Sequence, residues 1–289
     1  MTDDNSIFQR VSTALQSAWP DGAADIREYL VPLITIFAES GRQDSHYLDE
    51  LNSGETGKLA SRIWEALLFN RLHNLGWEIS GNGTGPDFLI NHEIYVEAVA
   101  PQRADSDPAI VDETTFDSIL LRWTSALRNK RNKHMSDIEK GYADPGRPFV
   151  IAINSCLFDS NTHGIGSVPL AAMAVLPFGD PAATVNVHTG EIIGPWNLQW
   201  RDQIINYNQQ PVQTDSFLND DYRCVSAVIG CSAFFIDEGD RDRFLGQPPY
   251  FIVHNPRAEK PLPKPWLPSS YEYDVEISPS GDLQLRRLG

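Results

Sequence analysis

The chain has 289 residues with a net charge of −16, and 41% of its residues are hydrophobic. This composition indicates a globular protein with a sizeable core, built as one large domain or as one domain with an appendage. No apolar run approaches the roughly 18 residues that span a bilayer, and the acidic start MTDDNSIFQR does not resemble a secretory signal. The negative charge argues against a broad, nonspecific nucleic-acid coat, which needs many Lys and Arg residues.

The three cysteines, Cys156, Cys224 and Cys231, form neither a CxxC pair nor an even disulfide framework. We therefore expect reduced thiols and a cytoplasmic protein that does not enter a membrane.

In chain order, the hydrophobic pattern predicts helices at residues 5–18 and 22–40 and then a polar linker at 41–57. The next helix is well defined, because Leu68, Leu72 and Leu75 recur at helical spacing and Gly76 follows as a cap. After residue 57 we expect a helix, three strands, a helix and a strand, over residues 58–75, 77–80, 87–90, 94–100, 113–140 and 148–154.

The rest of the chain gives weaker signals. We expect a helix, a hairpin, an irregular insertion, two core strands and a terminal hairpin turning at Ser278–Gly281, over residues 167–178, 183–194, 195–220, 223–235, 249–254 and 272–287. The expected organisation is an N-terminal helical segment (1–50) and an α/β domain (51–289). That domain divides into a core, an insertion, further core strands and a terminal hairpin, at 58–154, about 155–220, 221–256 and 270–289.

Two carboxylates, Asp87 and Glu97, are expected to face each other across a strand pair. If Asn91–Glu93 is a three-residue turn, Asp87 lies directly opposite Glu97, with Cβ atoms about 5 Å apart. A two-residue turn would shift the register by one and place them on opposite faces. Two carboxylates this close repel each other unless a cation lies between them, and Mg²⁺ prefers such oxygen ligands.

Glu65 continues the apolar stripe of the helix at 58–75, three residues before Leu68. A carboxylate on a buried stripe is costly unless it is paired or bound to a metal. The alternative is that Glu65 lies at the edge of the stripe and reaches solvent.

Lys130 continues the apolar stripe of the helix at 113–140, seven residues after Trp123 and three after Leu127. Its ammonium is therefore expected to turn inward, towards the carboxylates. Five basic residues occur in this helix without an acid between Asp117 and Asp137: Arg122, Arg128, Lys130, Arg131 and Lys133. Such a concentration can bind phosphates, or it can be a solvated basic face.

Gly85-Pro86-Asp87-Phe88, nine intervening residues and then Glu97 in Val96-Glu97-Ala98-Val99 resemble the PD-(D/E)XK nuclease superfamily. The resemblance covers residues 58–154, about a third of the chain. It implies a restriction-endonuclease-like αβββαβ core, a mixed sheet flanked by helices, here with N-terminal helices and a β-rich C-terminal extension.

The resemblance also implies site roles. Asp87, Glu97 and the backbone carbonyl of Ala98 would hold a Mg (or Mn) ion, and Glu65 would be the acid that the first helix supplies. The products would be those of phosphodiester hydrolysis, on DNA by resemblance alone. Arg122, Arg128 and Lys133 are the expected nucleic-acid-binding residues.

The chain departs from the family pattern at one position. The family lysine stands two residues after the third-strand acid, where this chain has Val99. Some members carry the lysine on the following helix, and Lys130 is the expected substitute. Gln102 is another polar group near the strand end. Without a substitute, the chain would be an inactive relative.

Three functions therefore stay open from the sequence. The leading one is a Mg-dependent nuclease, an endonuclease or exonuclease with nucleic acid as partner. The second is a non-catalytic protein of the same fold that binds nucleic acid or a protein partner. The third is an unrelated α/β enzyme or interaction protein with a chance match. A homodimer is compatible with each.

Overall fold

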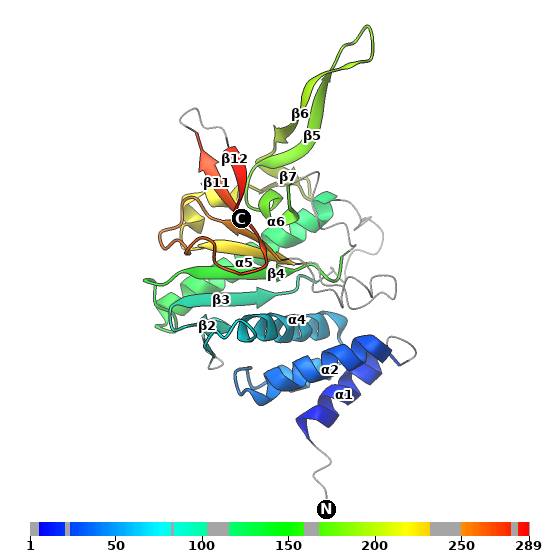
Figure 1. Cartoon of the computed structure of the whole chain (residues 1–289), viewed down its shortest axis with the longest axis vertical. Coiled ribbons are helices and arrows are strands. Elements are labelled where there is room, and N and C mark those ends of the chain that lie inside the picture. Colours follow the sequence, from blue (N-terminus) through cyan, green and yellow to red (C-terminus); the bar gives the residue numbers. More distant parts are fainter. Residues whose placement is uncertain are drawn as a thin grey trace, which may run out of the picture.

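The structure is a computed structural model that describes residues 6–20, 24–81, 84–102, 116–158, 168–231, 250–278 and 283–288. The described chain is mixed α/β, with an eight-stranded mixed sheet flanked by helices (Figure 1). This agrees with the α/β class expected from the sequence.

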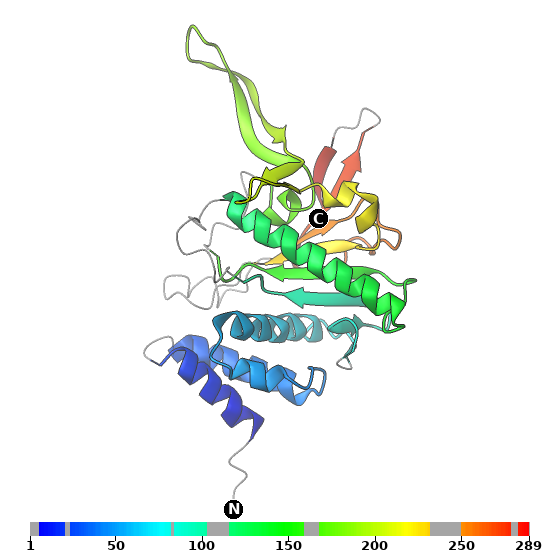
Figure 2. The ribbon, with the colours of Figure 1, turned by 180° about the vertical axis from the view of Figure 1, so that it is seen from behind.

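The N-terminal part is helical, as expected, with α1 (Ile7–Ala18) and α2 (Ala24–Glu39). The expectation of a linker at 41–57 is wrong in part, because it contains α3 (Tyr47–Leu51), whose two terminal residues are buried. Both α1 and α2 lie on the side of α4 (Thr56–His73) that faces away from the sheet (Figures 1 and 2). Their apolar side chains belong to the same core cluster as those of α4.

The six elements after residue 57 follow in the predicted order. The helices are α4 and α5 (Phe116–Glu139), and the strands are β1 (Ile79–Ser80), β2 (Phe88–Ile90), β3 (Ile94–Val99) and β4 (Phe149–Asn154). Gly76 follows α4 with a positive φ of 76°, the left-handed conformation expected of a helix cap. The predicted first three residues of the long helix, 113–115, lie outside the described residues.

The remaining elements correct several expectations. The predicted helix at 167–178 is reduced to α6 (Leu170–Met173), and the predicted hairpin is longer, with β5 (Phe178–Val185) and β6 (Ile192–Trp200). The insertion at 195–220 is not irregular, since it holds the end of β6 and a small hairpin. The other elements are β7 (Gln203–Ile205), β8 (Pro211–Gln213), 3-10 turns at Ser216–Leu218 and Asp220–Tyr222, β9 (Ala227–Cys231), β10 (Phe251–His254), β11 (Tyr271–Ile277) and β12 (Leu283–Leu288).

Strands β9 and β10 lie within the two predicted core strands, and β11 and β12 form the predicted terminal hairpin, which joins the same sheet. The strand order is β1-β2-β3-β4-β9-β10-β11-β12. The central strands β3, β4 and β9 are parallel, and β4 and β9 are buried at every residue. Parallel strands of this kind are covered on both faces. The expected turn of the last hairpin lies outside the described residues apart from Ser278.

Alternate residues of the central strands enter two separate apolar cores. On one face, Val96 and Ala152 pack with α4. On the other face, Ile151 and Val228 pack with the apolar stripe of α5, which crosses the sheet in Figure 2. This alternation follows from the two-residue period of a strand, and it decides which strand residues face α5.

Candidate functional site

The turn between β2 and β3 sets the register of the site. The observed pairs are Phe88↔Val96, Leu89↔Tyr95 and Ile90↔Ile94, so Asn91–Glu93 is the expected three-residue turn and the two-residue alternative is wrong. One further step along this register places Asp87 opposite Glu97. The Asp87 carboxylate accepts a hydrogen bond of 2.8 Å from the backbone N–H of Ala98. Asp87 therefore lies just before the first residue of β2, with its side chain held against β3.

Glu97 is the most enclosed carboxylate of the site, with 1% of its surface exposed. It shares the α5 face of β3 with Tyr95, whose ring lies in the α5 core. Lys130 Nζ lies 2.8 Å from Glu97 Oε1, which confirms the inward orientation predicted for Lys130. Lys133 Nζ lies 3.0 Å from Glu97 Oε2. Each carboxylate oxygen thus accepts from a different ammonium group.

Lys133 connects three parts of the site. Besides Glu97, its ammonium donates to the Gly85 carbonyl at 2.7 Å and to Asp137 Oδ2 at 3.2 Å. Gly85 belongs to the loop that carries Asp87. The sequence placed Lys133 beside the apolar stripe as a phosphate ligand, whereas its side chain joins the Asp87 loop to α5.

Glu65 approaches from α4, on the other face of the sheet, and only 13% of its side chain is exposed. The alternative of a solvent-directed Glu65 is therefore wrong. Both of its oxygens accept from Arg62 Nη1, at 2.9 and 2.8 Å. Arg62 also contacts Glu50 (2.8 Å) and Asp44 (2.9 Å). The hydroxyl of Tyr47 donates to the Arg62 carbonyl. These contacts fix Glu65 to the N-terminal helices.

Burial and neighbouring charges both perturb the ionisation of these groups. Burial, followed by the charge of Asp87, raises the pKa of Glu65 to about 8. Burial, followed by the charge of Glu97, raises the pKa of Asp87 to about 6, although Lys130 and Lys133 oppose this change. Burial disfavours the Lys130 ammonium, but the carboxylates, Glu97 foremost, outweigh it and raise the pKa of Lys130. The three carboxylates therefore compete for positive charge.

The groups around Asp87 fit a hard divalent cation in donor type. Asp87 and Glu97 supply carboxylate oxygens. The N–H and C=O groups of one strand residue point to the same side of the strand, so the Ala98 carbonyl faces the side on which its N–H meets Asp87. In the part of the chain that the structure describes, no three His, Cys, Asp or Glu side chains form a ready cation site. A cation held by Asp87, Glu97 and the Ala98 carbonyl would need one lysine to leave Glu97.

Two further predicted residues, Arg122 and Arg128, also lie on α5. Arg122 is half-buried, two turns before Lys130, and Arg128 is exposed. Arg128 acts electrostatically on Tyr222, as does Arg131, whose guanidinium lies over the Tyr222 ring. Lys130 and Lys133 thus contact the carboxylate Glu97, whereas Arg128 and Arg131 lie near Tyr222.

The structure also places Val99 and Gln102. Val99, which stands where the PD-(D/E)XK pattern has a lysine, packs against the α5 core. Gln102, the second polar group considered, lies against Gly57 at the start of α4.

Arg62 and Asp137 are the polar partners that the sequence reasoning missed. Both could have been found by helical spacing, since Arg62 precedes Glu65 by three residues and Asp137 follows Lys133 by four.

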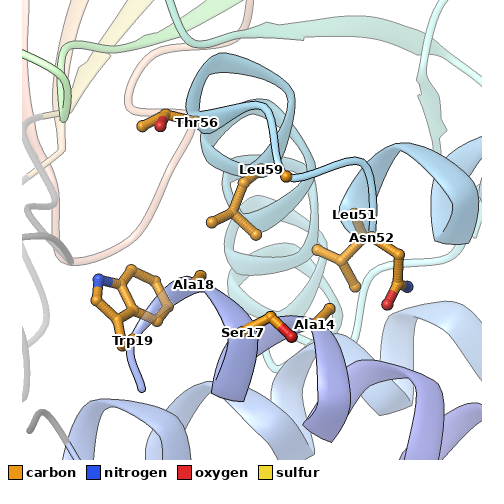
Figure 3. A pocket seen from close by; sticks show the side chains of 9 residues that line it. Ala14, Ser17, Ala18, Trp19, Leu51, Asn52, Thr56 and Leu59 are labelled. Atoms are coloured by element: carbon orange, nitrogen blue, oxygen red, sulfur yellow. The ribbon is translucent and has the colours of Figure 1, made fainter. Parts of the chain in front are cut away.

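A pocket of about 290 Å³ lies elsewhere, between α1, α3 and the start of α4 (Figure 3). Its lining is largely small or apolar, with Trp19 and Leu59 among the larger side chains, and it includes none of the residues of the carboxylate site. The site described above is thus defined by its side chains and not by this cavity.

Comparisons with models of protein families, with curated proteins and with solved structures found no match for this chain. In the described residues, no helix is both long and apolar enough to cross a lipid bilayer.

Proposed function

We propose that the chain is a metal-dependent nuclease with a restriction-endonuclease-like core, and that it hydrolyses phosphodiester bonds in DNA. The observation that carries the proposal is the convergence of Asp87, Glu97 and Lys130 from three different elements. The order of elements from α4 to β4 supports the same core. The choice of DNA over RNA depends on the sequence resemblance.

Asp87, Glu97 and the Ala98 carbonyl are the groups that would hold Mg²⁺ or Mn²⁺. When bound, the ion polarises the phosphodiester and lowers the pKa of a bound water. Their hard oxygen donors support this assignment.

The side chains of the chain itself supply the remaining functions. Lys130 is directed at the carboxylates and can orient the attacking water or stabilise negative charge developing on the phosphorus oxygens. Lys133 holds the loop of Asp87 through the Gly85 carbonyl, and its exposed portion can contact a phosphate. Arg122 and Arg128 would contact flanking phosphates, which provide most of the affinity in such complexes.

A second candidate is a non-catalytic protein of the same fold that binds nucleic acid or a protein partner. The observation that favours it is the pairing of both Glu97 oxygens with ammonium groups. In such a protein, the lysines would replace the cation permanently and the carboxylate cluster would be purely structural.

Incubation with single- and double-stranded DNA and RNA, with Mg²⁺ or Mn²⁺, separates these candidates. The wild type should cleave DNA and bind Mn²⁺ in a calorimetric titration. Asp87→Asn and Lys130→Met should each lose cleavage by roughly 100-fold or more. The matched control is Lys140→Met, which removes an exposed lysine just after α5, and it should cleave normally. Nucleic-acid binding without metal binding or cleavage would select the second candidate in its nucleic-acid-binding form. The absence of all three would reject the nuclease and leave only the protein-binding form of the second candidate.

A further inference from the structure

The hairpin of β5 and β6, residues 178–200, projects from the body of the molecule as an arm (Figures 1 and 2). Its base is held firmly. Phe178 is buried, and Arg201, just after the arm, makes ion pairs with Asp117 (3.1 Å) and Asp180 (4.0 Å). The Arg201 guanidinium also lies over the Phe116 ring. The start of α5 therefore fixes the root from which the arm leaves the body.

The arm exposes large apolar side chains along its length. They are Val185, Val187, Ile192, Ile193, Leu198 and Trp200. Val187, beside the turn, is 88% exposed. Val185 and Ile192 are directly opposite in the register and so share a face. Ile193, the next residue, points to the opposite face, so both faces of the arm expose apolar side chains. A two-stranded ribbon has little stability of its own in water, and exposed apolar surface of this kind marks an interaction site.

The charges of the arm disfavour two classes of partner. Residues 178–200 contain no Lys or Arg, so the arm has no permanently positive side chain to pair with a nucleic-acid phosphate or an anionic lipid headgroup. Its two acids lie at its ends. Asp180 is near Arg201 at the base, and Glu191 accepts from Thr189 in the turn. The strands between them are uncharged, which suits an equally uncharged protein surface.

We propose that the arm packs against the arm of a second copy of this chain and forms a two-fold symmetric dimer. Copies that each carry a charge of −16 repel each other, and the arm is a surface where that charge is absent. Strands of 8 and 9 residues are roughly 26–30 Å long. This length exceeds the screening length of about 8–10 Å at physiological salt. Paired arms would therefore join the copies and keep their acidic bodies apart.

The exposed edges of the ribbon support the same partner. Within the described residues, β5 and β6 form a sheet of two strands only, so each has one edge without a neighbouring strand. Such edges pair readily with another strand. In a two-fold dimer, the same patch of each copy meets the other, which matches a ribbon whose apolar residues occur on both strands.

Analytical ultracentrifugation of the full chain from 1 to 100 µM tests this proposal without any measurement of catalysis. The wild type should form a dimer in a concentration-dependent manner. Placing like charges on the arm with the double substitution Val185→Asp and Ile192→Asp should weaken the dimer tenfold or more. Ile36→Asp, at a half-exposed apolar position on α2, should leave it unchanged. Far-UV circular dichroism and melting curves check that each variant is folded.

A charge-swap experiment identifies the partner surface. The chain with Val185→Lys and Ile192→Lys should be monomeric alone. It should form a 1:1 heterodimer with the chain that carries Val185→Asp and Ile192→Asp, because opposite charges then meet on the two arms. A monomeric wild type at 100 µM would overturn the proposal, and so would dimers that survive in the arm variants. Failure of the two charged variants to associate with each other would show that the arm meets some other surface.

Discussion

Removal of the Lys130 ammonium by the substitution Lys130→Met should destabilise the fold, because the buried Glu97 carboxylate is left with one ammonium partner instead of two. Breaking a buried ion pair by removing one partner costs about 3–5 kcal/mol. Two features lower this value here. Lys133 remains 3.0 Å from Glu97, and the Lys130 side chain is 22% exposed. We therefore expect a loss of about 2–3 kcal/mol at pH 8.

The same loss should depend on pH. The pKa of Asp87 is raised to about 6, although the charge of Lys130 lowers it. Removing Lys130 should therefore raise the pKa of Asp87 further. When the pKa of a carboxyl is higher in the folded state than in the unfolded state, the folded state favours the protonated, neutral acid. The stability that this group contributes is present at low pH and is lost as pH rises from about 4 through the folded-state pKa. The destabilisation by Lys130→Met should therefore be smaller at pH 5 than at pH 8.

Urea unfolding followed by tryptophan fluorescence measures both effects. Lys140→Met is the control and should change the free energy of unfolding by less than about 0.5 kcal/mol. The double variant Glu97→Gln with Lys130→Met should recover part of the loss, because it removes both charges. A loss below 1 kcal/mol that is equal at pH 5 and pH 8 would refute the reasoning.

Three further predictions concern Glu65, His134 and the proposed cation site. Because the pKa of Glu65 is raised to about 8, its ionisation opposes folding as pH rises from about 4.5 to 8. Glu65→Gln should gain stability relative to wild type over that range, and equal slopes in urea unfolding would contradict this. Burial lowers the pKa of His134, which stacks on Phe149, to about 4. The stability contributed by the neutral imidazole is therefore lost as pH falls from 6.5 towards 4. The substitution His134→Phe should remove up to roughly 3 kcal/mol of this loss, so the free energy of unfolding should fall less steeply between pH 6.5 and 4.5 than in the wild type. Mg²⁺ at ten times its Kd should raise the wild-type melting temperature by about 2–5 °C, whereas a similar rise for Asp87→Asn would argue against Asp87 as a ligand.

The sequence predicted the elements around the site because their patterns were long or strongly alternating. The helix α5 shows a repeated apolar stripe over many turns, and its direction placed Lys130 inward correctly. The short helix α3 was missed. Five residues are too few for a period to be read, and Tyr47 is held by a distant contact to the Arg62 carbonyl. Tertiary packing, and not local propensity, forms that turn.

The position of Lys133 shows a second limit. Helical geometry gives the direction of a Cβ atom, and by that measure Lys133 lay beside the stripe. A lysine side chain is long and flexible enough to reach sideways, and the Gly85 carbonyl and Glu97 were brought within its reach by the fold.

The length of the β5–β6 arm was underestimated for another reason. The register of β5 and β6 contains two irregularities, which interrupt the alternation that marks a strand in sequence.

The turn Asn91–Glu93 constrains both the identity and the number of its residues. Asn91 and His92 both adopt positive φ values, a conformation that Gly, Asn, Asp and His accept more readily than β-branched or bulky residues do. The number of residues is fixed as well, because one inserted residue would turn Asp87 to the opposite face of the sheet. In the evolution of this chain, a change in the length of a surface turn could abolish the carboxylate pair without altering any residue of the site.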